Sequence, residues 1–85
     1  MGNGTQQKTV AIYSTPTCHF CQMTKEFFKE NNISYQDYNV ATDLGKRQEM
    51  FNITEQMGVP VTVIGDDVVI GFDKAKLSEL LGIAA

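Results

Sequence analysis

The chain has two cysteines, and they lie close together in the segment Cys18-His19-Phe20-Cys21. This segment follows a short apolar run that ends at Ser14 and precedes a stretch whose apolar residues recur at helical spacing. Two intervening residues let both sulfur atoms meet in one small ring, so the pair can cycle between a dithiol and a disulfide. A fold for this chain therefore has to bring the pair to a strand–helix junction.

The residues around the cysteines predict one strand on each side of a helix. Lys8 to Ser14 predicts a buried first strand, and Pro16 interrupts it because proline cannot donate to a ladder. A helix is expected from His19 to Glu30, and the sequence from Ser34 to Val40 alternates well enough to predict a second strand. The apolar residues of that helix are Phe20, Met23, Phe27 and Phe28.

A second helix is expected further along the chain. Thr42 or Asp43 can cap its N-terminus, and it should run to about Asn52. Its predicted inner face consists of Leu44, Gln48 and Phe51.

The last third of the chain predicts a hairpin and a closing helix. Two β-branched runs, 61–64 and 68–70, are joined by Gly65-Asp66-Asp67, which is typical of a turn between antiparallel strands. Asp73 can cap a helix that ends at Leu81 before Gly82. The order is therefore βαβαββα, in which the first half requires parallel strands and a right-handed crossover.

Length and charge exclude several classes of function. The 85 residues allow one domain, expected over residues 8–85 after a flexible tail of residues 1–7. The net charge is −3 and Lys46-Arg47, interpreted as a solvated helix face, is the one adjacent basic pair, so we expect no nucleic-acid partner. No apolar stretch is long enough to span a membrane, and the tail lacks the pattern of a signal peptide. We expect a cytoplasmic monomer.

In a reducing cytoplasm, an isolated cysteine pair is more often catalytic or metal-binding than a permanent crosslink. Disulfide chemistry near neutral pH requires a thiolate, and a helix N-terminus favours the anion through its free N–H groups and dipole. Cys18 is expected just before the helix and Cys21 in its first turn. Cys18 is therefore the better nucleophile, and Cys21 the resolving thiol that releases the reduced substrate.

Other interpretations of this segment stay open. As an imidazolium, His19 would stabilise the Cys18 thiolate, or it is simply a solvent-facing side chain at the helix tip. A structural zinc site needs four ligands, so one chain with His19 and two cysteines would have to pair with a second copy to bind zinc or an iron–sulfur cluster. No metal site is expected in the single chain.

A second local signal is Gly58-Val59-Pro60, which directly precedes a strand. The bond before Pro60 can be cis or trans. In the cis form it would present the backbone of Val59 outward, where an extended substrate can pair with it as an added strand.

Three separated motifs resemble those of the glutaredoxin family, in particular its small bacterial glutaredoxin-like branch, which is related to the NrdH-type redoxins. The motifs are Ser14 to Cys21, Gly58-Val59-Pro60 and Gly71-Phe72-Asp73, and the resemblance extends from about Lys8 to Gly82. It implies a thioredoxin fold with a four-stranded mixed sheet in the order 2-1-3-4 and three helices on its two faces. It also implies a cis Val59–Pro60 bond beside the sulfurs, an exposed Cys18 and a buried Cys21. Phe20 takes the position of a tyrosine that packs on the thiol substrate.

Departures from the family pattern concern the electron donor. Residues 15–17 lack the lysine that glutathione-using members carry near the cysteines, and Gly58 replaces a threonine. Phe72 replaces a glycine where glutathione should approach the backbone, although Asp73 can still bind an amine or cap the last helix. His19 stands where many relatives have proline. The Gly71-Phe72 pair is more similar to redoxins that thioredoxin reductase reduces directly.

These observations predict a thiol–disulfide oxidoreductase without a tightly bound cofactor. Its substrates would be disulfides of proteins or small molecules, and its reductant thioredoxin reductase. One alternative is a glutathione-dependent glutaredoxin with glutathione as co-substrate. An alternative from another class is a non-catalytic module that binds a protein partner or, as a dimer, a metal cluster.

Overall fold

The computed structural model describes residues 9–83, and the predicted tail of residues 1–7 lies outside the described residues. The predicted order βαβαββα is confirmed. The elements are β1 (Val10–Ser14), α1 (His19–Glu30), β2 (Gln36–Asn39), α2 (Leu44–Thr54), β3 (Val61–Ile64), β4 (Asp67–Ile70) and α3 (Lys74–Leu81).

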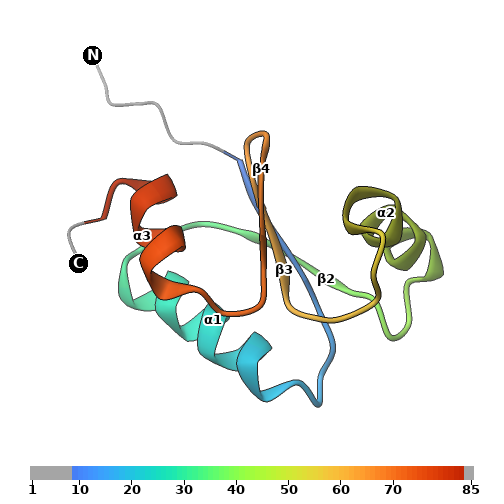
Figure 1. Cartoon of the computed structure of the whole chain (residues 1–85). Coiled ribbons are helices and arrows are strands. Elements are labelled where there is room, and N and C mark those ends of the chain that lie inside the picture. Colours follow the sequence, from blue (N-terminus) through green and yellow to red (C-terminus); the bar gives the residue numbers. More distant parts are fainter. Residues whose placement is uncertain (1–8, 84–85) are drawn as a thin grey trace.

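The strands form one mixed sheet in the order β2-β1-β3-β4 (Figure 1). β1 and β2 are parallel, because α1 crosses over between them, and β3 pairs antiparallel with both β1 and β4. This is the arrangement that the family resemblance implies, so the predicted sheet order is confirmed.

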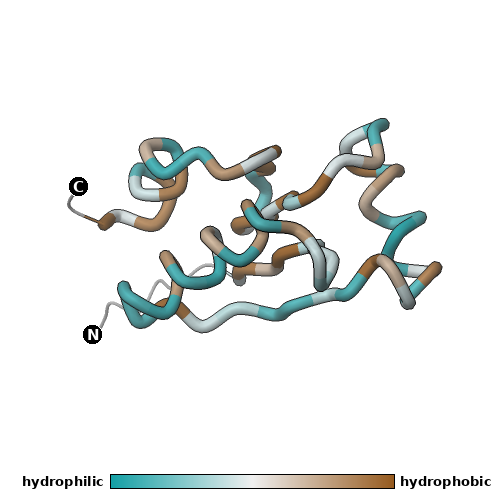
Figure 2. The backbone as a smooth tube through the Cα atoms, turned by 90° about the horizontal axis from the view of Figure 1, so that it is seen from below, coloured by the Kyte–Doolittle hydropathy of each residue, from teal (hydrophilic) through white to brown (hydrophobic). Residues whose placement is uncertain are grey.

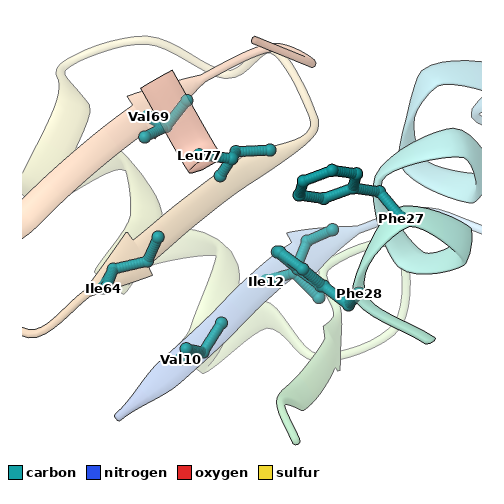
Figure 3. Packing of buried hydrophobic residues seen from close by; sticks show 7 residues of the cluster. All are labelled: Val10, Ile12, Phe27, Phe28, Ile64, Val69 and Leu77. Carbon is teal, nitrogen blue, oxygen red and sulfur yellow. The ribbon is translucent and has the colours of Figure 1, made fainter. Parts of the chain in front are cut away.

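The helices lie on both faces of the sheet: α1 and α3 cover one face and α2 covers the other (Figure 1). Successive strand residues point to opposite faces, so Ile12 and Tyr13 belong to different clusters. The cluster under α1 and α3 contains Val10, Ile12, Phe27, Phe28, Ile64, Val69 and Leu77 (Figure 3). The cluster under α2 contains Tyr13, Val40, Met50 and Val61.

Capping residues explain where α2 begins and where α3 begins and ends. The Asp43 carboxylate accepts a hydrogen bond from the Lys46 N–H at 3.0 Å, and Asp73 accepts one from the Lys76 N–H at 3.1 Å. Gly82 ends α3 with a φ of 71°, a left-handed conformation that glycine adopts without steric cost. Both aspartate caps agree with the prediction.

The predicted inner face of α2 is wrong. Leu44 and Phe51 are exposed large hydrophobic residues, Gln48 is exposed, and the buried side chain of α2 is Met50. The apolar residues of this helix do not form one stripe, so their spacing does not identify the side that faces the sheet. A hydrogen bond of 2.6 Å from the Tyr13 hydroxyl to the Glu49 carboxylate instead joins α2 to β1.

β2 is shorter than the predicted Ser34–Val40. It is an edge strand of polar residues, and its trace in Figure 2 is pale to teal. A polar side chain at an edge leaves the alternation of buried and exposed positions weak, which is why the sequence does not define its ends.

Candidate active site

The register of the sheet brings the three motifs of the sequence to one end of the molecule. Tyr13 is opposite Val61, and Val61 is opposite Ile70, so these residues form one row across β1, β3 and β4. The segment with the cysteines follows β1 at this row, and Gly71 follows β4 there. Pro60 directly precedes β3 at the same row. All three segments lie at the lower end of the sheet in Figure 1, which we call the cysteine end.

Cys18 and Cys21 form a disulfide, with their Cα atoms 5.2 Å apart. A turn delivers the first cysteine: the Cys18 N–H donates to the Thr15 carbonyl oxygen at 3.3 Å across Pro16 and Thr17. Cys18 is the N-cap of α1, with an extended backbone. Its sulfur accepts a hydrogen bond from the Cys21 N–H at 3.1 Å, so the sulfur occupies the position where a capping oxygen normally lies.

The two cysteines differ in burial. Cys21 is fully buried, whereas Cys18 is half-buried at the surface. The first turn of α1 contains no acidic residue that would oppose a thiolate at its N-terminus. The burial of Cys21 agrees with what the resemblance implies. A disulfide-bearing substrate can therefore reach the sulfur of Cys18 but not that of Cys21.

His19 and Phe20 are both exposed on the outer side of this turn. Their rings make an edge-to-face contact with centroids 5.7 Å apart. Within residues 9–83 no hydrogen bond reaches the His19 ring. Phe20 is 57% exposed, so much of its ring is available to a ligand.

Polar contacts hold the end of β1, the strand that precedes the cysteine pair in the sequence. Ser14, the buried last residue of β1, donates to the Asp37 carboxylate of β2 at 2.8 Å. The same carboxylate pairs with Lys25 of α1 at 2.8 Å. One aspartate therefore connects β1, β2 and α1.

The Val59–Pro60 bond is cis, as the resemblance implies. Pro60 is buried, and its carbonyl oxygen accepts from the Gly71 N–H at 2.8 Å, which joins the second and third motifs. The side-chain amide of Gln56 binds both backbone groups of Gly58, at 2.7 Å and 3.0 Å. In the described residues, no hydrogen bond reaches the backbone N–H or C=O of Val59, so these groups are available to an extended ligand.

The third motif has clear structural roles. Gly71 has a φ of +83°, which favours glycine. Phe72 is half-buried and packs edge-to-face on Phe27 of α1, with centroids 6.2 Å apart. Asp73 uses one carboxylate oxygen to cap α3, so the capping alternative for this residue is realised.

Sequence reasoning missed residues that line a hollow beside Val59. Its volume is about 230 Å³, and its lining includes Thr15, Arg47 and Met57 as well as Val59. The sequence predicts Arg47 only as part of a solvated helix face, and Met57 lies in a loop, so no pattern marks either residue. The position of Met57 two residues before the Val59–Pro60 motif is the signal that was available.

The described residues contain neither a metal-binding cluster nor a membrane-spanning helix. Among residues 9–83, no three His, Cys, Asp or Glu side chains are placed to hold a metal ion together. No helix in this part of the chain is long and apolar enough to cross a membrane.

A CxxC pair at a helix N-terminus, on a sheet with this strand order, defines a thiol–disulfide oxidoreductase of thioredoxin fold. The chain belongs to the glutaredoxin family, whose sequence model matches residues 10–69. It is 46% identical over 72 residues to a glutaredoxin-like 8.6 kDa protein of the rubredoxin operon in Clostridium pasteurianum. That alignment covers 85% of this chain and 96% of the relative.

Solved structures support the same assignment. The thioredoxin-like protein BC3987 is 34% identical and superposes with a TM-score of 0.81. The superposition covers 86% of this chain and 100% of that protein. The glutaredoxin of Archaeoglobus fulgidus is 28% identical, with a TM-score of 0.79 over 86% of this chain and 85% of the other. The NrdH-redoxin of Escherichia coli, at 22% identity and a TM-score of 0.74 over 85% and 93% of the two chains, shares the fold.

Proposed function

We propose that this oxidoreductase reduces disulfides through Cys18 as the nucleophile and Cys21 as the resolving thiol. The observation that carries the proposal is the position of the Cys18 sulfur, which is surface-accessible at the N-cap of α1 and accepts the Cys21 N–H. In the dithiol form the same N–H and the helix dipole stabilise a thiolate. Cys21 is buried, so it attacks only a sulfur that Cys18 has already brought in.

The reaction transfers two electrons in two exchanges. The Cys18 thiolate attacks one substrate sulfur; a Cys18–substrate bond forms as the substrate disulfide breaks, and the other substrate sulfur leaves and takes a proton from water. Cys21 then loses its proton and attacks the Cys18 sulfur. The Cys18–Cys21 disulfide forms, and the first substrate sulfur leaves as a thiol. A Cys18–Cys21 disulfide, the pairing found in this structure, is the expected product of that cycle.

Residues around the pair position the substrate. The unpaired backbone groups of Val59 bind an extended substrate segment as an added strand, and the exposed Phe20 ring packs on the thiol being exchanged. Gly58 and Pro60 hold Val59 in place through Gln56 and Gly71. His19 directly follows the N-cap in the sequence, and as an imidazolium it would favour the thiolate.

We propose thioredoxin reductase as the reductant, with electrons passing through the protein to a disulfide substrate in a reducing cytoplasm. Three features support this choice over glutathione. Phe72 occupies the third motif with a bulky ring packed on Phe27, and Asp73 already caps α3 with one of its oxygens. Residues 15–17 also carry no cation for a glutathione carboxylate. Glutathione as co-substrate remains the alternative, and no tightly bound cofactor is part of the proposal.

The test follows NADPH oxidation with an added disulfide substrate in two parallel systems. One contains thioredoxin reductase, and the other contains glutathione with glutathione reductase. We expect turnover with thioredoxin reductase and little with glutathione; the reverse result would assign a glutaredoxin that tolerates Phe72.

Two cysteine variants test the order of the exchanges. Cys18→Ser should abolish turnover, whereas Cys21→Ser should accumulate a mixed disulfide with the substrate that mass spectrometry detects. Full activity of Cys18→Ser in cells would instead support a non-catalytic binding module.

A further inference from the structure

One side chain, that of Gln56, holds the loop that leads to the cis proline. Its amide oxygen accepts from the Gly58 N–H at 2.7 Å, and its amide nitrogen donates to the Gly58 carbonyl oxygen at 3.0 Å. A hydrogen-bonded residue in an antiparallel ladder likewise donates to and accepts from one neighbour. The Gln56 amide therefore takes the place of a strand partner for Gly58, and we call this pair of bonds the Gln56 clamp.

The Gln56 clamp is anchored in the last turn of α2. The side-chain amide and the backbone N–H of Gln56 each donate to the Thr54 hydroxyl oxygen at 3.4 Å. The Thr54 hydroxyl in turn lies 3.0 Å from the Gln56 carbonyl oxygen and 2.8 Å from that of Met50, so it can donate to either. Because Thr54 and Gln56 are also half-buried, the clamp is in place before a substrate binds.

Gly58 is a glycine for a reason of space and not of backbone conformation. Among the glycines of residues 9–83, positive φ values occur at Gly65, Gly71 and Gly82, and Gly58 has none. A Cβ atom added to Gly58 would lie 2.7 Å from the Gln56 amide oxygen, closer than two such atoms approach. Any side chain at this position would therefore displace the end of Gln56, which accounts for a glycine where the family pattern has threonine.

The Gln56 clamp acts on the neighbour of the residue that meets the substrate. When Val59 pairs with an added strand, the backbone groups of Gly58 point to the opposite edge, which is where Gln56 binds them. On the other side of Val59, the Pro60 carbonyl oxygen accepts from the Gly71 N–H at 2.8 Å. Ordering a free loop costs free energy when a ligand binds, and a loop that is already held avoids this cost.

We propose that Gln56 is a positioning residue for the disulfide exchange. Its side chain holds Val59 ready for strand pairing, and it thereby favours extended peptide disulfides over small disulfides that have no backbone to pair. This inference rests on the proposed function, because the pairing of Val59 with a substrate is part of that function. The clamp acts on recognition, so the intrinsic reactivity of Cys18 does not depend on it.

The test compares oxidants in single-turnover oxidation of the reduced full-length protein. One oxidant is a symmetric disulfide of two identical short peptides, and the reference is bis(2-hydroxyethyl) disulfide, which has no peptide group. In both reactions Cys18 and Cys21 become a disulfide, and the oxidant is reduced to two thiols. A matched peptide with N-methyl groups on its cysteine and both neighbours lacks the N–H groups that strand pairing needs. Acid quenching, alkylation and mass spectrometry give the second-order rate constants.

We expect Gln56→Ala to lower the rate constant for the peptide disulfide about fivefold, which corresponds to about 1 kcal/mol for ordering the loop. The rate constants for the reference and for the N-methylated peptide should stay within about twofold. Gly58→Ala should reproduce the loss, because its side chain displaces Gln56, and it should add nothing in a Gln56→Ala background. The matched control is Gln48→Ala, since this exposed glutamine of α2 bonds Asn52 at 3.0 Å, and all rate constants should be kept.

Amide exchange measured by NMR reports on the Gln56 clamp directly. The Gly58 N–H should exchange faster in Gln56→Ala than in the unmodified protein, because it loses its acceptor. Circular dichroism confirms that each variant is folded.

Three results would overturn the positioning proposal alone. The first is a Gln56→Ala variant that reacts with peptide and reference disulfides in the same ratio as the unmodified protein. The second is a loss from Gly58→Ala that adds to that from Gln56→Ala, because Gly58 would then act independently of the clamp. The third is unchanged exchange of the Gly58 amide. Failure of every disulfide to oxidise the unmodified protein would contradict the proposed function itself.

Discussion

Cys18 occupies a backbone position that serves both the helix and the chemistry. As the N-cap of α1 it satisfies the Cys21 N–H, and the same contact would stabilise a thiolate in the reduced protein. His19 adds a second charge at this tip only when it is protonated. The separate effects of the helix end and of His19 can therefore be measured at one sulfur.

We predict that His19→Gln raises the pKa of the Cys18 thiol, because it removes a cation that favours the thiolate. At this exposed position the effect should be modest, with the rate of iodoacetamide labelling of the reduced protein about twofold to fivefold lower near pH 7. The measurement is the pH profile of Cys18 labelling by mass spectrometry. A profile identical to that of the unmodified protein would leave the helix N-terminus as the source of thiolate stabilisation and remove His19 from the mechanism.

Gly71 shows how one residue shapes the third motif. A methyl group added to Gly71 would contact nothing within 4 Å, but the φ of +83° is strained for any other residue. We therefore predict that Gly71→Ala lowers the free energy of unfolding by about 1–2 kcal/mol through the backbone alone. Denaturant titration measures this loss, and Gly45→Ala inside α2 is the control, expected to be neutral or stabilising by up to about 1 kcal/mol. Equal effects of the two substitutions would refute the backbone explanation.

At the scale of elements, one buried side chain and one hydrogen bond to β1 are the main contacts that hold α2 to the sheet. Met50 is its fully buried side chain, and the Tyr13–Glu49 hydrogen bond of 2.6 Å connects it to β1. Burial, and then the hydrogen bond to Glu49, raise the pKa of Tyr13 far above its ordinary value near 10. The same hydrogen bond, followed by that from Lys46, lowers the pKa of Glu49.

We predict that Tyr13→Phe lowers the free energy of unfolding by about 1 kcal/mol at neutral pH, the net value of one hydrogen bond. The pH dependence is diagnostic. Above about pH 10 the unfolded chain ionises this tyrosine while the folded protein keeps it neutral, so stability falls as the pH rises. Tyr13→Phe should lack that component of the fall, and urea unfolding at pH 7 and pH 10.5 tests it. Identical pH dependences for the two proteins would show that the hydroxyl is not held in this bond.

Most of the elements could be predicted from the sequence, because local signals define them. Asp43, Asp73 and Gly82 mark helix ends, and the β-branched runs of β3 and β4 mark the hairpin. The face of α2 could not be predicted, since its orientation depends on a polar contact with Tyr13, far away in the sequence. The convergence of the three motifs follows from topology, but the position of Arg47 in the hollow beside Val59 depends on that same orientation.

At the scale of the whole molecule, the sheet separates two cores of unequal size. In the described chain, seven buried residues form the cluster under α1 and α3, whereas four form the cluster under α2. Local opening is easiest where the least apolar surface is buried. α2 should therefore open more readily than α1.

We predict that backbone amides in the middle of α2 exchange with solvent at least about tenfold faster than those in the middle of α1, after correction for intrinsic rates. This corresponds to an opening free energy lower by about 1.4 kcal/mol. Native-state hydrogen exchange followed by NMR measures both helices in one sample. Equal protection of the two helices would mean that Met50 and Glu49 hold α2 as firmly as the larger core holds α1.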